Sequence, residues 1–368
     1  MNKINYKSVP IKRIGKVVTG KTPATAHKEF YDGQYMFISP TELHGGYFVK
    51  KSEKTLTEAG LKSVKSNSID GTSILVGCIG WDMGNVAMCN EKCATNQQIN
   101  SITEIKEEYN PYYVYYWLCG KKEYLFSIAS VTRTPILSKS VFEEVLVPLP
   151  EKKQQDNVVN ILLRIDKKIA LNEQINDNLE QQMHLIFEDM MAKATNNKIK
   201  GEFIVAKSLT QVITGKEDAN FSVSNGKYKF FTCSNTPLHC DEYAFNSSSV
   251  LIAGNGDFNV KHYSGKFNAY QRTYVLSPQK EYYAILYLAA LYRINSFKTG
   301  SSGSIVKFIT KSDVENIPVF IPHDSKYLDE LNKLVIMQEQ NMLENELLMQ
   351  LRDWLLPMLM NGQATISD

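Results

Sequence analysis

The chain has 368 residues, of which 43% are hydrophobic and 22% are charged, and its formal net charge is +2. This composition is ordinary for a globular protein, and the length is sufficient for two or three domains. No run of about 18 apolar residues is present that would span a membrane, and the N-terminal sequence MNKINYKSVPIKRIG lacks the apolar stretch of a signal peptide. We therefore expect a cytoplasmic protein.

Charge is distributed unevenly along the chain. Residues 1–149 have a net charge of +4 and residues 195–322 of +5, whereas residues 150–194 have −2 and residues 323–368 have −5. Because basic surfaces attract polyanions, we expect any nucleic acid to bind the first and third segments. A chance imbalance of surface charge is the alternative explanation.

The first segment alternates predicted strands, turns and helices. VVTGKTP at 17–23 predicts a helix end or a short strand, followed by a tight loop, and QYMFIS at 34–39 predicts a strand. GTSILVGCIGW at 71–81 predicts a strand that ends in a glycine-rich turn, and NPYYVYYWLCGKK at 110–122 predicts an aromatic helix. SVTRTPILSKSVFEEVLVPLP at 130–150 predicts a polar loop, a short helix and a strand. Together these elements indicate an α+β globule.

A long amphipathic helix follows, over residues 150–194. Alternating three- and four-residue spacing places one stripe of mostly apolar residues on a single face: Leu162, Ile165, Ile169, Asn172, Asn176, Leu179, Met183 and Ile186. At 1.5 Å per residue such a helix reaches about 65 Å, more than one small domain needs to cover its core. We therefore expect a partner helix, with Asn172 and Asn176 fixing its register.

The third segment repeats the first with little literal identity. VITGK at 212–216 corresponds to VVTGK, and GKYKFF at 226–231 corresponds to GQYMFI. SVLIAGNG at 249–256 corresponds to SILVGCIG, and the block SSGSIVKFITKSDVENIPVFIP at 301–322 corresponds to the block that ends at Pro150. The order of elements is kept while the loops differ, which indicates one scaffold carrying two different surfaces.

The final segment repeats the long helix. A shift of 172 residues sets Leu162 on Leu334 and Leu179 on Leu351, so the two helices share one register. The third segment connects the end of the first helix to the start of the second, which predicts that the second helix returns antiparallel. A pseudo-twofold axis would then relate the two globules. A single amphipathic helix packed on its own domain is the simpler alternative for each run.

The long helices and the strands that precede them resemble those of a known family. The run VPLPEKKQQDNVVNILLRIDKKIALNEQINDNLEQQMHLIFEDM, preceded by ILSKSVFEEV, and the closing RDWLLPMLMNGQ with IPVFIP before its helix are similar to the specificity subunit of type I restriction-modification systems. The similarity covers essentially the whole chain. Its most specific features are the proline-rich strand leading into each helix and the alternation of globule with helix.

The resemblance implies an α+β fold with two target-recognition domains, 1–149 and 195–322, separated by two long antiparallel coiled-coil helices, 150–194 and 323–368. It implies that each globule reads one half of a bipartite DNA target and that the helices dock two modification subunits. The chain would be non-catalytic and hold no cofactor, because S-adenosylmethionine, ATP and magnesium belong to the modification and restriction subunits of the complex.

Polar residues of the repeated loops are the predicted DNA contacts. Lysines can meet phosphates, arginine can pair with guanine, and glutamine has the geometry to pair with adenine. The candidates are Lys21, Gln97, Gln98, Arg133, Thr134, Lys216, Gln271, Arg272, Ser301, Ser304, Lys307 and Lys311. For each of them a solvated surface position is the alternative interpretation.

Apolar residues near the ends of the helices are the predicted subunit interface, on the expectation that they form exposed patches. These are Met183, Phe187, Met190, Met191, Trp354, Leu355 and Leu356.

Two other functions fit part of the sequence. The tetrad NPYY at Asn110–Tyr113 is close to the NPPY motif of adenine methyltransferases, in which the asparagine binds a flipped base, so a stand-alone N6-adenine DNA methyltransferase is the main alternative. A coiled-coil scaffold without a nucleic-acid role is the third. We predict no metal site, since Cys233, His239 and Cys240 lack a fourth ligand nearby, and we expect the six cysteines to be thiols.

Overall fold

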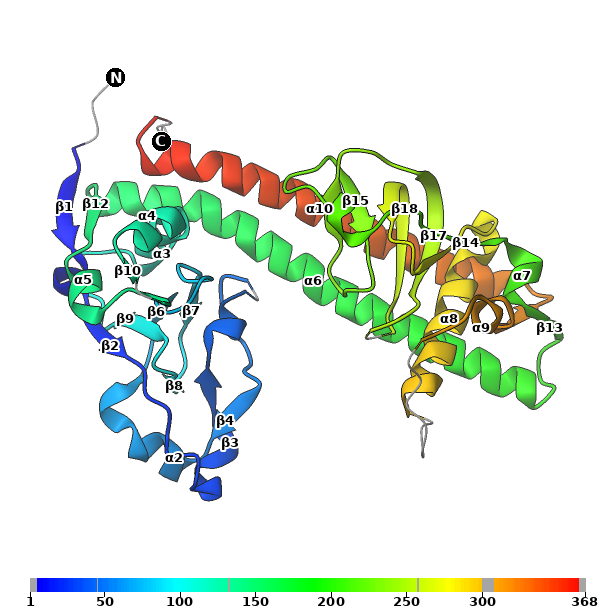
Figure 1. Ribbon diagram of the computed structural model, residues 1–368, viewed down its shortest axis with the longest axis horizontal. Helices are drawn as coiled ribbons and strands as arrows, with labels where there is room; N and C mark the ends of the chain where they lie inside the picture. The colour runs from blue at the N-terminus through cyan, green and yellow to red at the C-terminus, as the bar shows by residue number, and fades with distance from the viewer. Residues whose placement is uncertain (1–4, 45, 132, 257, 300–307, 364–368) are drawn as a thin grey trace. The chain divides into compact units, whose positions relative to one another are not determined.

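The structure is a computed structural model that describes residues 5–44, 46–131, 133–256, 258–299 and 308–363. The chain forms two compact units, one of residues 1–169 and 347–368 and the other of residues 170–346 (Figure 1). Each unit therefore contains one globule and a part of both long helices. The six cysteines are free thiols, as predicted. Within the described ranges, every helix is too short or too polar to cross a membrane.

The globule of unit 1 is built on two four-stranded sheets and a two-stranded ribbon. The first sheet has the order β2 (Lys16–Thr19), β9 (Ile99–Thr103), β6 (Ser73–Gly77), β7 (Val86–Cys89). The second has the order β4 (Lys54–Leu56), β3 (Tyr31–Ile38), β8 (Cys93–Thr95), β5 (Ser68–Ile69). The ribbon pairs β1 (Lys7–Pro10) with β12 (Leu146–Leu149), and β10 (Ser130–Val131) pairs with β11 (Pro135–Ile136). The helices are α1 (Ile11–Ile14), α2 (Glu58–Ser63), α3 (Pro111–Cys119), α4 (Lys122–Ser127) and α5 (Lys139–Glu143), with 3-10 turns at Lys28–Phe30, Pro40–His44 and Lys65–Asn67.

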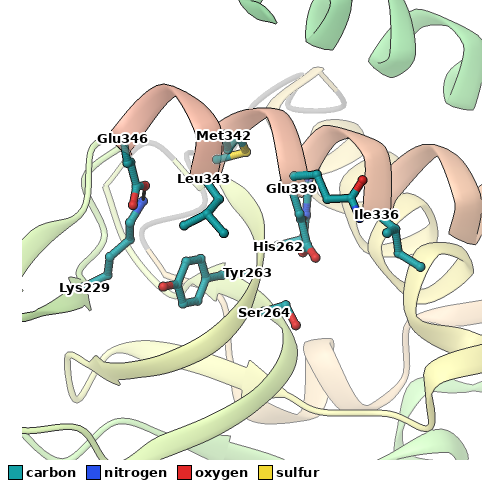
Figure 2. Close-up of a pocket in the computed structure, with 10 residues that line it drawn as sticks. Lys229, His262, Tyr263, Ser264, Ile336, Glu339, Met342, Leu343 and Glu346 are labelled. Carbon is teal, nitrogen blue, oxygen red and sulfur yellow. Dashed lines mark hydrogen bonds and ion pairs between the residues drawn. The ribbon is translucent and has the colours of Figure 1, made fainter. Parts of the chain in front are cut away.

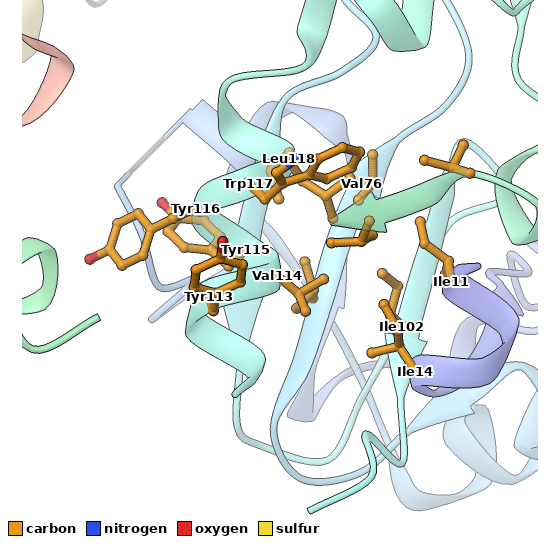
Figure 3. Packing of buried hydrophobic residues seen from close by; sticks show 14 of the residues in the cluster. Ile11, Ile14, Val76, Ile102, Tyr113, Val114, Tyr115, Tyr116, Trp117 and Leu118 are labelled. Atoms are coloured by element: carbon orange, nitrogen blue, oxygen red, sulfur yellow. The ribbon is translucent and has the colours of Figure 1, made fainter. Parts of the chain in front are cut away.

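Helix α3 is the aromatic helix predicted from the sequence. Pro111 occupies its first turn, and the Asn110 side chain caps it by accepting hydrogen bonds from the backbone of Tyr112 and Tyr113. Six of its nine residues are buried, and they pack beside residues of α1, β6 and β9 (Figure 3). The buried residues of α3 therefore join this helix to the core of the globule, and the Tyr116 hydroxyl also donates to Asp166 of the long helix that follows.

The globule of unit 2 is built on one six-stranded sheet. Its order is β14 (Val212–Thr214), β19 (Thr273–Leu276), β17 (Phe245–Ala253), β18 (Val260–Ala269), β15 (Tyr228–Phe231), β16 (Leu238–Cys240). A ribbon pairs β13 (Gly201–Val205) with β20 (Pro318–Pro322). The helices are α7 (Ala206–Leu209), α8 (Tyr283–Thr299) and α9 (Lys311–Glu315), with 3-10 turns at Ala219–Phe221 and Lys280–Tyr282.

The strand topology confirms the predicted repeat. The order β14-β19-β17-β18 matches β2-β9-β6-β7, and the ribbon β13-β20 matches β1-β12. Among the described strands, β15 pairs in parallel with β18 in unit 2, and β3 pairs in parallel with β8 in unit 1. Strand β18 is a single strand of ten residues, whereas unit 1 divides the equivalent chain into β7 and β8. The six-stranded sheet of unit 2 is therefore split into two sheets in unit 1.

The two long helices are α6 (Lys152–Thr195) and α10 (Lys326–Met360). In unit 1, Leu162 of α6 shares a core with Leu359 and Met360 at the end of α10. In unit 2, Phe187 near the end of α6 shares a core with Leu331 near the start of α10. Within each unit the two helices thus run in opposite directions, as predicted.

Buried polar contacts between the helices repeat as well. In unit 1, Arg352 donates to Asp166 at 3.0 Å, and in unit 2 Gln338 donates to Glu180 at 3.0 Å. A shift of 172 residues converts each pair into the other, since Asp166 becomes Gln338 and Glu180 becomes Arg352. The two units therefore place a polar contact between α6 and α10 at equivalent positions of the repeat, with different side chains.

Asn172 and Asn176 lie on the helix seam. The buried Asn172 donates to Glu344 at 2.7 Å and to Asn345 at 2.8 Å. Asn176 accepts from Asn341 at 2.8 Å. Polar pairs at such positions favour one register over its neighbours, which is the role predicted for them.

Three predicted interface residues are buried instead. Met183 and Met190 have no exposed surface and Phe187 has 4%, because all three pack into the core formed with α10 and the globule of unit 2. Met191 packs half-buried against the same core. The expectation that these residues form an exposed patch is therefore wrong.

Polar side chains hold the globule of unit 2 against α10. Lys229 pairs with Glu346, and Figure 2 shows their side chains meeting end to end. His262 bonds Glu339 at 3.0 Å and Gln338 at 2.9 Å. Between these two contacts lies a small cavity of about 210 Å³, lined in part by Tyr263 and Leu343. The charged side chains that line this cavity are paired with one another, Lys229 with Glu346 and His262 with Glu339. These pairs therefore hold the globule of unit 2 on α10.

The Asp166 contact gives a stability prediction. Asp166 is 2% exposed and also accepts from the Tyr116 hydroxyl at 2.6 Å. Arg352→Ala leaves a buried carboxylate without its cation, so we expect the free energy of unfolding to fall by about 3 kcal/mol, the lower end for a broken buried pair. Denaturant unfolding measures it. The matched control is Lys12→Ala, which removes the exposed ion pair with Glu144 and should cost about 1 kcal/mol or less. Equal losses in the two variants would contradict the assignment.

Candidate nucleic-acid interface

In unit 1, the loop after β2 lies against the turn between β8 and β9. The backbone amide of Lys21 donates to Thr95 at 2.9 Å, and the Thr22 hydroxyl donates to the Gln97 side chain at 2.8 Å. Lys21 and Gln97 are exposed, and Gln98 beside them is half-buried. Two predicted contact segments that are far apart in the sequence are therefore neighbours.

The loop that carries Arg133 joins the same face. The amide of Cys78, just after β6, donates to Gln98 at 2.7 Å, and the carbonyl of Cys78 accepts from Leu137 at 2.9 Å. The amide of Gly80 donates to Pro135 at 3.0 Å. Arg133 and Thr134 are exposed. We call the surface formed by Lys21, Gln97, Gln98, Arg133 and Thr134 loop face 1.

Unit 2 forms the equivalent surface with the same hydrogen bonds. The amide of Gly254, just after β17, donates to Arg272 at 2.8 Å, and the carbonyl of Gly254 accepts from Ile309 at 2.8 Å. The amide of Gln271 donates to Glu217, next to Lys216, at 2.9 Å. Three predicted residues, Lys216, Gln271 and Arg272, are exposed here and form loop face 2.

The remaining predicted contacts belong to the last loop of unit 2. Ser301, Ser304 and Lys307 lie outside the described residues. Lys311 is exposed at the start of α9, where its amino group lies 3.6 Å from Glu315 one turn later. An exposed pair of this kind is weak, so the lysine can exchange this partner for a phosphate.

Lys261 is a cation near loop face 2 that the sequence did not reveal. Its amino group bonds the Thr232 carbonyl and the side-chain oxygen of Asn259, both of which are uncharged. Asn259 in turn donates to Cys233 at 2.8 Å, and the Cys233 thiol lies 3.6 Å from the Arg272 carbonyl. Burial lowers the pKa of Lys261 to about 8. Only the tertiary fold brings this lysine near loop face 2, so no local motif marks it.

The NPYY tetrad serves a structural purpose. Besides capping α3, the Asn110 side chain donates to Asp156 at 2.7 Å, and the amide of Asn110 donates to Gln155 at 2.9 Å. Tyr113 has no exposed surface. The amide group that would bind a flipped adenine is therefore engaged with its own helix and with α6. Among the described residues, no three His, Cys, Asp or Glu side chains are grouped as metal ligands.

An exposed apolar stripe runs along the C-terminal part of α10. Leu347, Leu351 and Trp354 follow helical spacing and are 57%, 43% and 61% exposed. Leu355 and Leu356, also predicted as interface residues, are half-buried against the core of unit 1. Of the predicted set, Trp354 is thus the exposed one. Leu347 and Leu351 were missed, although their spacing of four and then three residues toward Trp354 is visible in the sequence.

Comparison with known proteins identifies the class to which this fold and these two loop faces belong. The family model of the type I restriction modification DNA specificity domain matches residues 3–181 and 200–347. The chain belongs to this family. The resemblance predicted from the sequence is therefore confirmed, and the two matched segments correspond to the two repeats.

Individual relatives agree with this assignment. The EcoDI specificity subunit of Escherichia coli is 37% identical over 164 residues, which are 43% of this chain and 37% of that protein. The MjaIX specificity subunit of Methanocaldococcus jannaschii is 23% identical over 406 residues, covering 97% of this chain and 93% of that protein. The crystal structure of the type I S subunit from M. genitalium has the same fold, with a TM-score of 0.60, 18% identity, and coverage of 98% of this chain and 97% of that one.

Lys261 gives a pH-dependent prediction. Its pKa falls from 10.5 to about 8 on folding, so between these values the unfolded chain binds more protons than the folded one. The free energy of unfolding should therefore rise with pH across this interval, and Lys261→Met should remove that contribution. Denaturant titrations at pH values from about 7 to about 10 measure it. Lys266→Met, an exposed lysine on the same strand, is the control that should keep the rise. An unchanged profile for Lys261→Met would contradict the prediction.

Proposed function

We propose that this chain is the sequence-specific DNA-binding specificity subunit of a type I restriction-modification complex, in which each globule reads one half of a bipartite target. The observation that carries the proposal is the repeated assembly of loop faces 1 and 2. In each globule, the same backbone hydrogen bonds gather three separate loops that present exposed lysine, glutamine and arginine side chains. Such side chains are the ones that contact phosphates and the major-groove edges of bases.

The two faces differ at equivalent positions. Gln98 and Arg272 accept the same backbone bond, from Cys78 and Gly254 respectively. A glutamine side chain suits adenine and an arginine side chain suits guanine. The same scaffold thus presents different base-contacting side chains in the two globules, which favours a target whose halves differ in sequence.

The long helices are the proposed docking surface for two modification subunits. The stripe of Leu347, Leu351 and Trp354 supports this, because exposed apolar residues that lie next to one another mark interaction sites. The chain itself supplies no catalytic group in this scheme. The modification and restriction subunits bring S-adenosylmethionine, ATP and magnesium to the DNA that the two loop faces have selected.

Salt dependence and sequence preference separate the roles of loop face 1. Lys21→Ala should weaken binding similarly for all sequences and reduce the slope of log K against log salt by about 1. Arg133→Ala should cost about 1–3 kcal/mol and relax the preference at one base pair. Fluorescence anisotropy of the complex with its modification subunits, on target and scrambled duplexes, measures both. Lys12→Ala, outside the loop face, is the control. If neither variant differs from this control, the proposal fails.

Docking is tested on α10. Trp354→Ala should weaken association with the modification subunit by about tenfold or more, because an exposed tryptophan in an apolar stripe is a typical hot spot. Sedimentation of the mixed subunits measures the affinity. Leu185→Ala, which removes a residue of 65% exposure on α6, is the matched control. Unchanged association of the Trp354 variant would place the interface elsewhere.

A further inference from the structure

The loop between β6 and β7 lies beside loop face 1 and differs in length from its counterpart in unit 2. Residues 78–85 separate Gly77 from Val86, whereas only residues 254–259 separate Ala253 from Val260 in unit 2. The loop of unit 1 is therefore two residues longer at an equivalent place. Trp81 lies at its centre.

This longer loop is held in one conformation. Gly80 and Gly84 adopt φ values of 101° and 88°, which other residues rarely adopt. The amide of Gly84 donates to Gly77 at 2.8 Å, and Asp82 accepts from Lys122 at 2.8 Å and lies 2.7 Å from His44. Because both the backbone and a side chain are fixed, the loop presents Trp81 in a defined direction.

The Trp81 side chain is 71% exposed, the largest value among the large hydrophobic residues that the structure describes. Its ring lies 6.0 Å from that of Phe126. The loop borders a hollow of about 380 Å³ that Thr41, Asn85 and Gln98 also line. A large apolar group kept in water on a rigid loop, next to hydrogen-bonding side chains, is the arrangement of a contact residue rather than of a core residue.

We propose that Trp81 is a specificity-determining residue of the first globule that makes an apolar contact with the C5-methyl group of a thymine in the half-site bound by loop face 1. The inference rests on the proposed function. The thymine methyl is the apolar feature that base pairs display in the major groove, where it lies beside the edges that glutamine and arginine bind. An indole ring adjacent to Gln98 on the same hollow complements such a mixed polar and apolar surface.

The test replaces thymine by deoxyuridine, which removes the methyl group and keeps every hydrogen bond of the base. The methylated motif is first mapped, and the wild-type complex with its modification subunits is then titrated with duplexes carrying one deoxyuridine at a time. We expect one thymine of one half-site at which the loss of the methyl weakens binding roughly fourfold, the effect of burying one such group. In Trp81→Ala, thymine and deoxyuridine at that position should bind equally well.

Two variants keep the result interpretable. Trp81→Phe retains an apolar ring and should preserve part of the discrimination. Tyr292→Ala, which removes a 66% exposed aromatic ring from the second globule, should preserve all of it. If the wild type responds to no thymine methyl, or if Trp81→Ala still discriminates in full, the inference is overturned. If the complex prefers its motif but binds thymine and deoxyuridine equally well, only this inference is contradicted. If the complex does not prefer its motif over scrambled DNA, the proposed function is contradicted.

Discussion

A pair of backbone hydrogen bonds in each globule determines where its exposed polar residues lie. The residue after the central strand, Cys78 in one globule and Gly254 in the other, donates to the turn that carries Gln98 or Arg272 and accepts from the loop before the next short helix. Because these bonds use only backbone atoms, they do not depend on the side chains that the loops present. The reading residues can therefore change while the surface that holds them stays the same.

The helices add a second constraint of the same kind. Each globule packs on both α6 and α10 within its own unit. In each unit an equivalent polar contact joins the two helices, Asp166 with Arg352 in unit 1 and Gln338 with Glu180 in unit 2. Burying such groups costs desolvation energy that only correct pairing offsets. A shifted register would leave the carboxylates unpaired. The polar seam therefore specifies one alignment of the two helices, and with it the part of each helix on which a globule packs.

Much of this organisation could be predicted from the sequence, because the chain contains the same order of elements twice. The correspondence of VVTGK with VITGK, and of the strands that end in glycines, predicted the shared topology, and the heptad-like spacing predicted both helices. Burial was harder to predict. The sequence places Met183 and Phe187 on one apolar face of the helix, but it does not show whether a core or a partner protein covers that face. The structure shows that α10 and the second globule cover it. Trp81 and Lys261 were missed for a related reason, since exposure and proximity to a loop face arise from segments distant in the sequence.

The central claim is that each globule reads its own half of one DNA target. It is tested most directly by mapping methylated adenines in cells that carry either this chain or a chimera in which residues 195–322 are exchanged for the matching globule of another specificity subunit. The account predicts a bipartite motif in which the exchange alters one half and leaves the other half and the spacing between them unchanged. A motif in which both halves change, or neither does, would contradict it.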